Sequence, residues 1–167
     1  PQEALTAYQQ ATSGTFGAEA LGRVVNLMFK QQGLPTTRKW LAEQVAAADT
    51  VERKSRLQLM EAQLLHEQQQ YKAAITVLDH ALQAKPNDTD LLYARALSRE
   101  RAKNFTAAES DLRAILKLKP DDATYLNALG YMLVENSKRY PEAADFIGKA
   151  LAKRPDDPAI MDSMGWI

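Results

Sequence analysis

The chain has 167 residues, of which 46% are hydrophobic and 25% are charged, so length and composition fit one globular domain and assign no function. Its 21 basic and 21 acidic residues cancel, which argues against nucleic acid as a partner because no net positive field attracts phosphates. The absence of cysteine excludes disulfide bonds, thiolate zinc sites and a cysteine nucleophile. No apolar run is long enough for a transmembrane helix, so we expect no direct membrane insertion by this sequence.

The first segment, residues 1–12, carries apolar side chains at helical spacing. Its pattern matches that of residues 141–151, which we place in the second helix of a helix pair. We therefore interpret residues 1–12 as the second helix of a truncated pair. A turn with two glycines follows, and it lacks the strand and the G-K-[ST] sequence of a phosphate-binding loop.

Residues 18–50 are predicted to form a degenerate helix pair. The first helix begins at Ala18 and ends at Gly33, and Pro35 opens a second helix that runs to about Ala47. Trp40 stands near a position where the later pairs carry a small residue, and no proline closes this pair. Its shape is expected to deviate from that of its neighbours.

From Ser55 onward the sequence repeats with a regular period, because Pro86, Pro120 and Pro155 lie 34 and 35 residues apart. The resulting units are 55–88, 89–122 and 123–157, and residues 158–167 begin a further unit. The first helix of each complete unit contains a small residue: Ala62, Ala96 and Gly130. An aromatic residue precedes each second helix: Tyr71, Phe105 and Tyr140. Each unit ends in an aspartate that is expected to cap the following helix: Asp88, Asp122 and Asp157.

The third unit has one additional residue, which we place in the turn between Glu135 and Arg139. Its landmarks are Leu129-Gly130, Leu133, Tyr140, Ala143, Ala150 and Pro155. This order of residues resembles the tetratricopeptide repeat family, strongly over 55–167 and weakly over 1–54. The resemblance implies an all-α, right-handed superhelix of antiparallel helix pairs, here cut inside a repeat at both ends. It also implies that the first helices line a concave groove that binds a peptide or a segment of another protein.

A narrower resemblance is to the later repeats of bacterial multi-repeat lipoproteins of the cell envelope. It rests on Leu129-Gly130-Tyr131, the run from Arg139 to Ala143, and the stretch from Asp156 to Trp166. Some of those lipoproteins are adaptors for carboxy-terminal processing proteases and cell-wall hydrolases. The resemblance favours a periplasmic or outer-membrane-anchored location. A cytoplasmic location stays open, because the sequence begins at proline and we interpret it as part of a longer protein.

The resemblance also places a set of first-helix residues on the groove. These candidate partner-binding residues are Arg56, Leu59, Gln63, His66, Asp90, Tyr93, Leu97, Glu100, Arg101, Asn127, Tyr131, Glu135, Asp162 and Trp166. Family members that bind chaperone tails use lysines and asparagines to grip a terminal carboxylate. The corresponding positions here hold Leu59, Gln63, Tyr93 and Leu97, and only Asn127 fits that pattern. A chaperone-tail receptor is therefore not expected.

The three groove aromatics have two interpretations. Tyr93, Tyr131 and Trp166 are candidates to anchor a bound segment, because aromatic side chains offer a large contact area at a modest entropic cost. Alternatively, they pack on one another or on a following repeat. A scaffold that binds a protein segment is the first functional hypothesis, and self-association through the repeat ends is the second.

Two opposite charges occupy a normally apolar position in successive first helices. We expect Glu61 to pair with Arg95 or Arg99, with a loss of about 3 to 5 kcal/mol on removal of one partner if the pair is buried. The alternative is that each charge reaches solvent separately.

Catalytic interpretations find little support. His66-Glu67 is not followed by the second histidine of a zinc protease motif, and His80 falls in a second helix, away from the groove. The acidic pairs Asp121-Asp122 and Asp156-Asp157 lie at repeat boundaries, where capping explains them better than hydrolysis. We expect no catalytic residues, metal site or cofactor.

Overall fold

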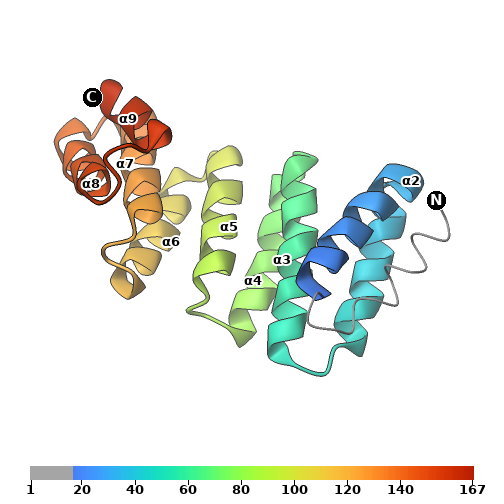
Figure 1. Cartoon of the computed structure of the whole chain (residues 1–167). Helices are drawn as coiled ribbons and strands as arrows, with labels where there is room; N and C mark the ends of the chain where they lie inside the picture. Colours follow the sequence, from blue (N-terminus) through green and yellow to red (C-terminus); the bar gives the residue numbers. More distant parts are fainter. Residues whose placement is uncertain (1–16) are drawn as a thin grey trace.

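The computed structural model describes residues 17–167, so the helix predicted at 1–12 and the turn after it lie outside the described part. All regular elements from residue 17 on are α-helices, which stack side by side into a solenoid (Figure 1). The helices are α2 (Gly17–Ala47), α3 (Val51–Glu67), α4 (Tyr71–Ala84), α5 (Thr89–Arg101), α6 (Phe105–Leu118), α7 (Ala123–Ser137), α8 (Tyr140–Lys153) and α9 (Pro158–Gly165). The predicted all-α solenoid is confirmed.

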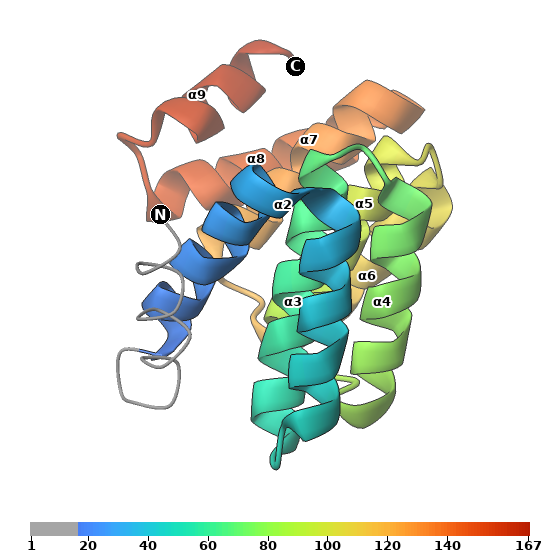
Figure 2. The same cartoon turned by 90° about the vertical axis from the view of Figure 1, so that its right-hand side faces the viewer.

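The long element α2 consists of two helical arms that meet at Gly33. Gly33 adopts φ 77° and ψ 174°, a backbone conformation that other residues rarely tolerate. Pro35 follows in the first turn of the second arm, where its missing N–H costs no helical hydrogen bond. The Thr37 hydroxyl donates to the Gly33 carbonyl at 2.9 Å. Figure 2 shows both arms, in blue and cyan, beside α3, and Leu41 joins Leu57 of α3 in the shared core.

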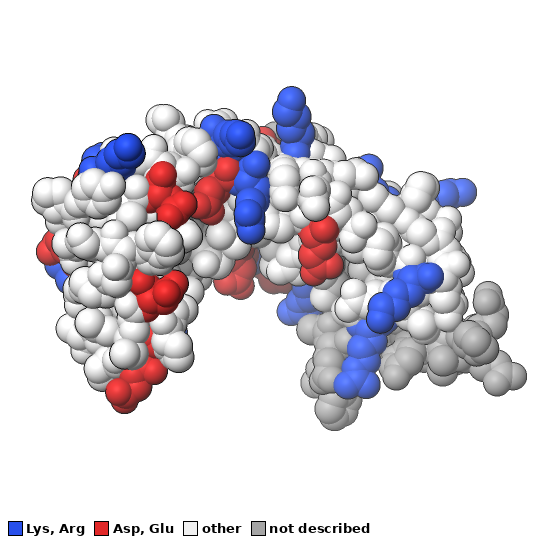
Figure 3. All heavy atoms as spheres, turned by 90° about the horizontal axis from the view of Figure 1, so that it is seen from above, with Lys and Arg blue, Asp and Glu red and all other residues white. Residues whose placement is uncertain are grey.

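A continuous apolar core runs from α3 to α9 between the two layers of helices. Each helix contributes residues three or four positions apart, so one face of every helix is buried. Fully buried members include Leu65, Leu78, Leu91, Ile115, Leu129, Leu133 and Ile147. The stack bends into an arch that is hollow on one side when seen from above (Figure 3).

Three aspartates begin successive first helices. The Asp88 carboxylate accepts from the backbone N–H groups of Asp90 and Leu91, and Asp122 accepts from that of Thr124. Asp157 accepts from the N–H of Ala159 at 3.0 Å. The predicted N-caps are confirmed, and each supplies a hydrogen bond that the first helical turn otherwise lacks.

The small residue of α7 permits a close crossing with α8. A Cβ atom added to Gly130 would lie 2.5 Å from Cγ1 of Ile147 and 3.1 Å from the carbonyl oxygen of Ala143. The α7–α8 crossing therefore requires glycine, whereas the equivalent Ala62 and Ala96 are each 1% exposed and fit as alanines.

The additional residue of the third unit lengthens the end of α7. The turns after α3, α5 and α7 each contain a left-handed residue, at Gln69, Lys103 and Lys138 respectively, two residues before the next helix. In the first two turns, a backbone N–H reaches a carbonyl five residues back, as Asn104 N–H does to Arg99 O at 2.8 Å. In the third, Arg139 N–H reaches six residues back to Leu133 O at 3.3 Å. The turn is therefore wider there.

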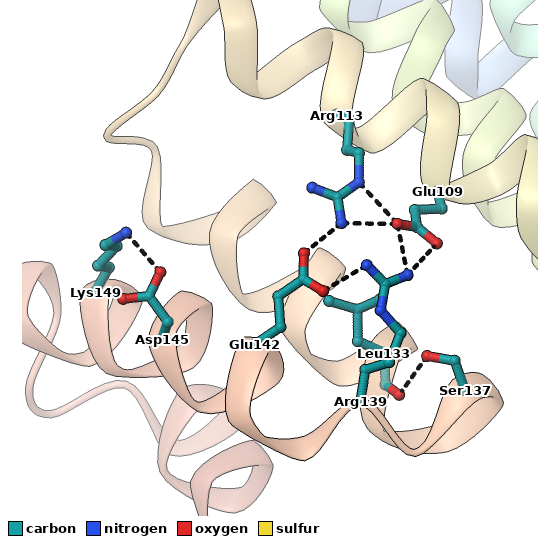
Figure 4. A network of polar contacts seen from close by, with 8 residues as sticks. All are labelled: Glu109, Arg113, Leu133, Ser137, Arg139, Glu142, Asp145 and Lys149. Carbon is teal, nitrogen blue, oxygen red and sulfur yellow. Dashed lines mark hydrogen bonds and ion pairs between the residues drawn. The ribbon is translucent and has the colours of Figure 1, made fainter.

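An ion-pair network crosses this wider turn (Figure 4). Arg139 donates to Glu109 of α6 at 2.9 and 3.0 Å and also pairs with Glu142 of α8. Arg113 of α6 binds both carboxylates from the other side. Ser137 Oγ donates to the Leu133 carbonyl at 2.9 Å. The network ties the lengthened turn to α6.

The expected pairing of Glu61 is wrong. Glu61 binds Arg38 of α2, with 2.8 Å between Nε and Oε1. Arg95 and Arg99 of α5 instead bind two aspartates of the flanking second helices, Asp79 of α4 and Asp111 of α6. The Asp111 side chain is only 4% exposed and accepts from both arginines at 2.7 Å. The sequence prediction considered charges at equivalent positions of first helices only. The carboxylates of this cluster come from second helices, so that prediction did not include them.

Replacing Asp111 with alanine is expected to lower the free energy of unfolding by about 3 to 5 kcal/mol, because two partly buried arginines lose their shared acceptor. Glu61→Ala is expected to cost less than about 1 kcal/mol, since its partner Arg38 has a 42% exposed side chain. Urea titrations of both variants measure the difference. Equal losses for the two variants would contradict this assignment.

Candidate protein-binding groove

The hollow side of the arch contains the first helices, and their spacing is uneven. Helix α3 contacts α5, and α7 contacts α9, but no Cα atom of α5 lies within 8 Å of a Cα atom of α7. Those two helices are joined through α6, which packs on both. The step from α5 to α7 is therefore the place where the inner layer opens.

A cavity of about 420 Å³ fills this opening. Helix α5 supplies Tyr93, Leu97 and Glu100, and α7 supplies Asn127 and Tyr131. A second cavity, of about 600 Å³, lies between α3 and α5. Because Tyr93 and Leu97 line both cavities, the two adjoin and form one groove.

Nine of the fourteen predicted residues line these cavities. They are Leu59, Gln63, His66, Asp90, Tyr93, Leu97, Glu100, Asn127 and Tyr131. The other five are exposed and line neither cavity: Arg56, Arg101, Glu135, Asp162 and Trp166.

The sequence interpretation also missed several lining residues. Thr124 and Ala128 share the helical face of Asn127 and Tyr131, so the i, i+3, i+4 pattern alone would have found them. Arg154 and Asp157 come from the connection between α8 and α9, and they reach the cavity through the stacking of the repeats. No spacing within one helix indicates that contact.

The groove aromatics differ in their surroundings. Tyr93 packs edge-on against Tyr125 of α7, with 5.2 Å between ring centroids. Burial raises the pKa of Tyr93, and Tyr125 adds to that effect. Tyr131 is 37% exposed beside the cavity, and Trp166 is 60% exposed outside it. Tyr93 therefore serves the packing of the groove wall, whereas Tyr131 offers a free aromatic surface.

One polar atom in the groove has no partner. Asn127 Oδ1 is buried and receives no hydrogen bond from the described residues. A buried acceptor without a donor costs free energy comparable to a lost hydrogen bond. Asn127 contributes to the wall of the cavity, but its Oδ1 atom has almost no accessible surface and does not face the cavity space.

His66 and Ser98 form a contact that is structural. The Ser98 hydroxyl donates to the carbonyl of Ala94 at 2.9 Å and therefore accepts from His66 Nδ1 at 3.0 Å. A serine whose proton is held by a backbone carbonyl is not activated by the histidine. Burial lowers the pKa of His66, and the positive charge of Arg101 adds to this effect.

Carboxylates gather around Tyr131. Burial raises the pKa of Tyr131, and Glu135, Glu100 and Asp162 raise it further, against the opposing effect of Arg101. Burial also raises the pKa of Glu100. Acidic side chains thus lie in and beside the C-terminal half of the groove, next to an exposed aromatic ring.

No group of three or more histidine, aspartate or glutamate side chains is placed to hold a metal ion among residues 17–167. Of the helices described, none has the length and apolarity to span a membrane.

The stacked helix pairs and the inner groove define a helical-repeat protein of the solenoid class. Tetratricopeptide repeat models match residues 55–98 and 93–158, and the chain belongs to this family. It is 43% identical over 111 residues to the TPR repeat-containing protein PA4667 of Pseudomonas aeruginosa, covering 66% of this chain and 19% of the relative. It is 30% identical over 98 residues to bacteriophage adsorption protein A of Escherichia coli, covering 59% and 10% respectively. The chain thus spans a fifth or less of these relatives.

Solved structures share the fold at low sequence identity. YrrB, described as a TPR protein with an unusual peptide-binding site, superposes with a TM-score of 0.72 and 19% identity, over 98% of this chain and 83% of YrrB. MamA from Desulfovibrio magneticus RS-1 gives 0.70 and 19%, over 94% and 88% of the two chains. The first TPR of Spaghetti (RPAP3), bound to the HSP90 peptide SRMEEVD, gives 0.63 and 21%, over 68% and 89%.

Stability is expected to fall as the pH drops below about 6.5. The folded state lowers the pKa of His66, so the unfolded chain takes up a proton that the folded chain resists. Neutral His66 therefore makes its full contribution to stability above the pKa that it has in the unfolded chain. This contribution is lost as the pH falls below that pKa. Urea titrations between pH 5 and 7 should show a weaker pH dependence for His66→Gln than for the parent. His80→Gln is the matched control, and an equal change in both variants would contradict the assignment to His66.

Proposed function

We propose that the groove formed by α3, α5 and α7 binds a segment of another protein, and that the chain is an interaction scaffold without chemistry of its own. The observation that carries this proposal is the pair of adjoining cavities along the first helices. Apolar walls with a few polar groups are typical of binding sites, and Leu59, Leu97 and Tyr131 supply the apolar contact here.

Two neighbours of similar fold support a peptide as the occupant. Spaghetti was solved with a bound peptide, and YrrB is described by its peptide-binding site. The chaperone-tail mode does not fit this groove, since Leu59, Gln63, Tyr93 and Leu97 replace the charged clamp. The ligand is therefore expected to differ from an acidic chain terminus.

The finer proposal is an adaptor in the bacterial envelope that presents a client to a protease or a cell-wall enzyme. The resemblance to envelope lipoproteins and the relatives in two bacteria support it. One protein segment in the groove leaves the outer layer of α4, α6 and α8 available for a second partner.

The groove is tested by selecting binders from a random library of nine-residue peptides displayed on phage. Selected peptides are then synthesised with capped ends, and their affinities are measured by fluorescence anisotropy. Tyr131→Ala is expected to weaken binding at least about tenfold, because it removes the exposed aromatic contact. Tyr140→Ala is the matched control, since Tyr140 is similarly exposed, at 42%, and lines neither cavity. If Tyr131→Ala and Tyr140→Ala bind the selected peptides with the same affinity, the proposal is overturned.

Self-association is the second candidate, and the exposed apolar residues near the end of α9 favour it. Met161, Trp166 and Ile167 are 56%, 60% and 44% exposed. A second copy that covered them would remove apolar area from water. Light scattering at increasing concentration is expected to show dimers that Trp166→Ala disrupts. A persistent monomer would contradict this candidate.

A further inference from the structure

Three acidic side chains from successive first helices lie around Tyr131. Glu100 belongs to α5, Glu135 to α7 and Asp162 to α9, and each acts electrostatically on the Tyr131 ring. None of the three takes part in an ion pair with another residue of the described chain. Glu100 also lines the cavity between α5 and α7.

The cations near this site do not balance the three carboxylates. Arg101, which follows Glu100 directly in the sequence, acts against them by lowering the pKa values of Glu100 and Tyr131. Arg154 is turned to Asp157 at 3.8 Å and to the Thr124 hydroxyl at 3.3 Å, so its charge is matched by an aspartate in the same wall. Three carboxylates against one free arginine leave the region with a net negative charge. Seen from above, acidic side chains appear along the hollow side of the arch (Figure 3).

Part of the wall of the cavity beside these carboxylates is apolar. Leu97, Ala128, Met132 and Ile160 contribute to its walls, and its volume of about 420 Å³ can hold a large aliphatic side chain. Apolar space and carboxylates without an ion-pair partner therefore adjoin one another along the step between α5 and α7.

We propose that this step binds an extended segment that places an aliphatic side chain in the cavity and a lysine or arginine beside Tyr131, among Glu100, Glu135 and Asp162. The inference rests on the proposed function and specifies its ligand. The cation gains three carboxylates and the face of an aromatic ring, which attracts it through the ring quadrupole. Burial raises the pKa of Glu100, and a cation bound beside it would act in the opposite direction.

The opposite ligand, an acidic segment, is disfavoured by the same charges. It would meet three carboxylates and only Arg101 as an unpaired cation in this half of the groove. Like charges brought together in a partly desolvated groove cost free energy and slow the association.

The experiment uses the peptides selected by the whole chain from the same nine-residue library. Selected sequences are expected to contain lysine or arginine next to leucine, isoleucine or methionine more often than the unselected library does. For the best binder, replacing that basic residue with norleucine is expected to weaken affinity at least about tenfold. The Glu100→Gln/Glu135→Gln variant should lose about the same factor for the basic peptide. It should bind the norleucine peptide as the parent does.

The matched control is Glu43→Gln/Glu52→Gln, which removes two exposed carboxylates that line neither cavity. It is expected to bind the basic peptide as the parent does. Selected peptides that depend on Tyr131 but show no basic preference, or prefer acidic residues, would overturn this inference and leave the proposed function standing. If the affinity of the selected peptides does not change with Tyr131→Ala, both this inference and the proposed function are overturned. If both double variants lose the same affinity for the basic peptide, the effect comes from the net charge of the chain. The proposed site around Tyr131 would then be overturned.

Discussion

The close packing of each first helix on its second helix is the interaction on which the rest of the structure depends. It requires a small side chain at one position of every first helix: Ala62, Ala96 and Gly130. The facing second-helix residues Ala74, Ala108 and Ala143 are fully buried. Because the solenoid has no core other than these contacts between neighbours, the crossing at each small residue sets the position of the next pair. The curvature that forms the groove results from the same helix crossing being repeated in each successive pair.

Much of this architecture is predictable from the sequence, because it is local and repeated. The aspartate caps and the break at Gly33 each depend on the backbone within a few residues. Their signals therefore survive in a single sequence. The groove was found in part, since helical spacing identifies a face and the family resemblance identifies which face points inward. Five exposed residues assigned to the groove, Trp166 among them, line neither cavity. Helical spacing indicates which way a side chain points, but it does not indicate whether that part of the surface is hollowed.

The ion pairs were not predictable in the same way. Comparing equivalent positions brought Glu61 and Arg95 together, but a long charged side chain reaches residues on several neighbouring helices. Arg95 finds Asp79 and Asp111 on the two second helices beside it, and Glu61 finds Arg38 of α2. Asp111 gave no signal in the sequence, because an aspartate in an amphipathic second helix is normally expected on the solvent side. Only the structure shows that it is buried between two arginines.

The distribution of paired and unpaired charges separates the two sides of the solenoid. Where α4, α5 and α6 meet, Arg95 and Arg99 share the Asp111 carboxylate at 2.7 Å, and the network of Figure 4 closes the widened turn after α7. These pairs hold the repeats in register. Around Tyr131, by contrast, the carboxylates of Glu100, Glu135 and Asp162 have no basic partner at ion-pair distance within residues 17–167. Several arginines of the described residues thus bind carboxylates elsewhere, and the acidic side chains around Tyr131 keep their negative charge at the edge of the groove. In the binding mode that we propose, the preference for a basic segment arises from that separation rather than from the net charge of the chain.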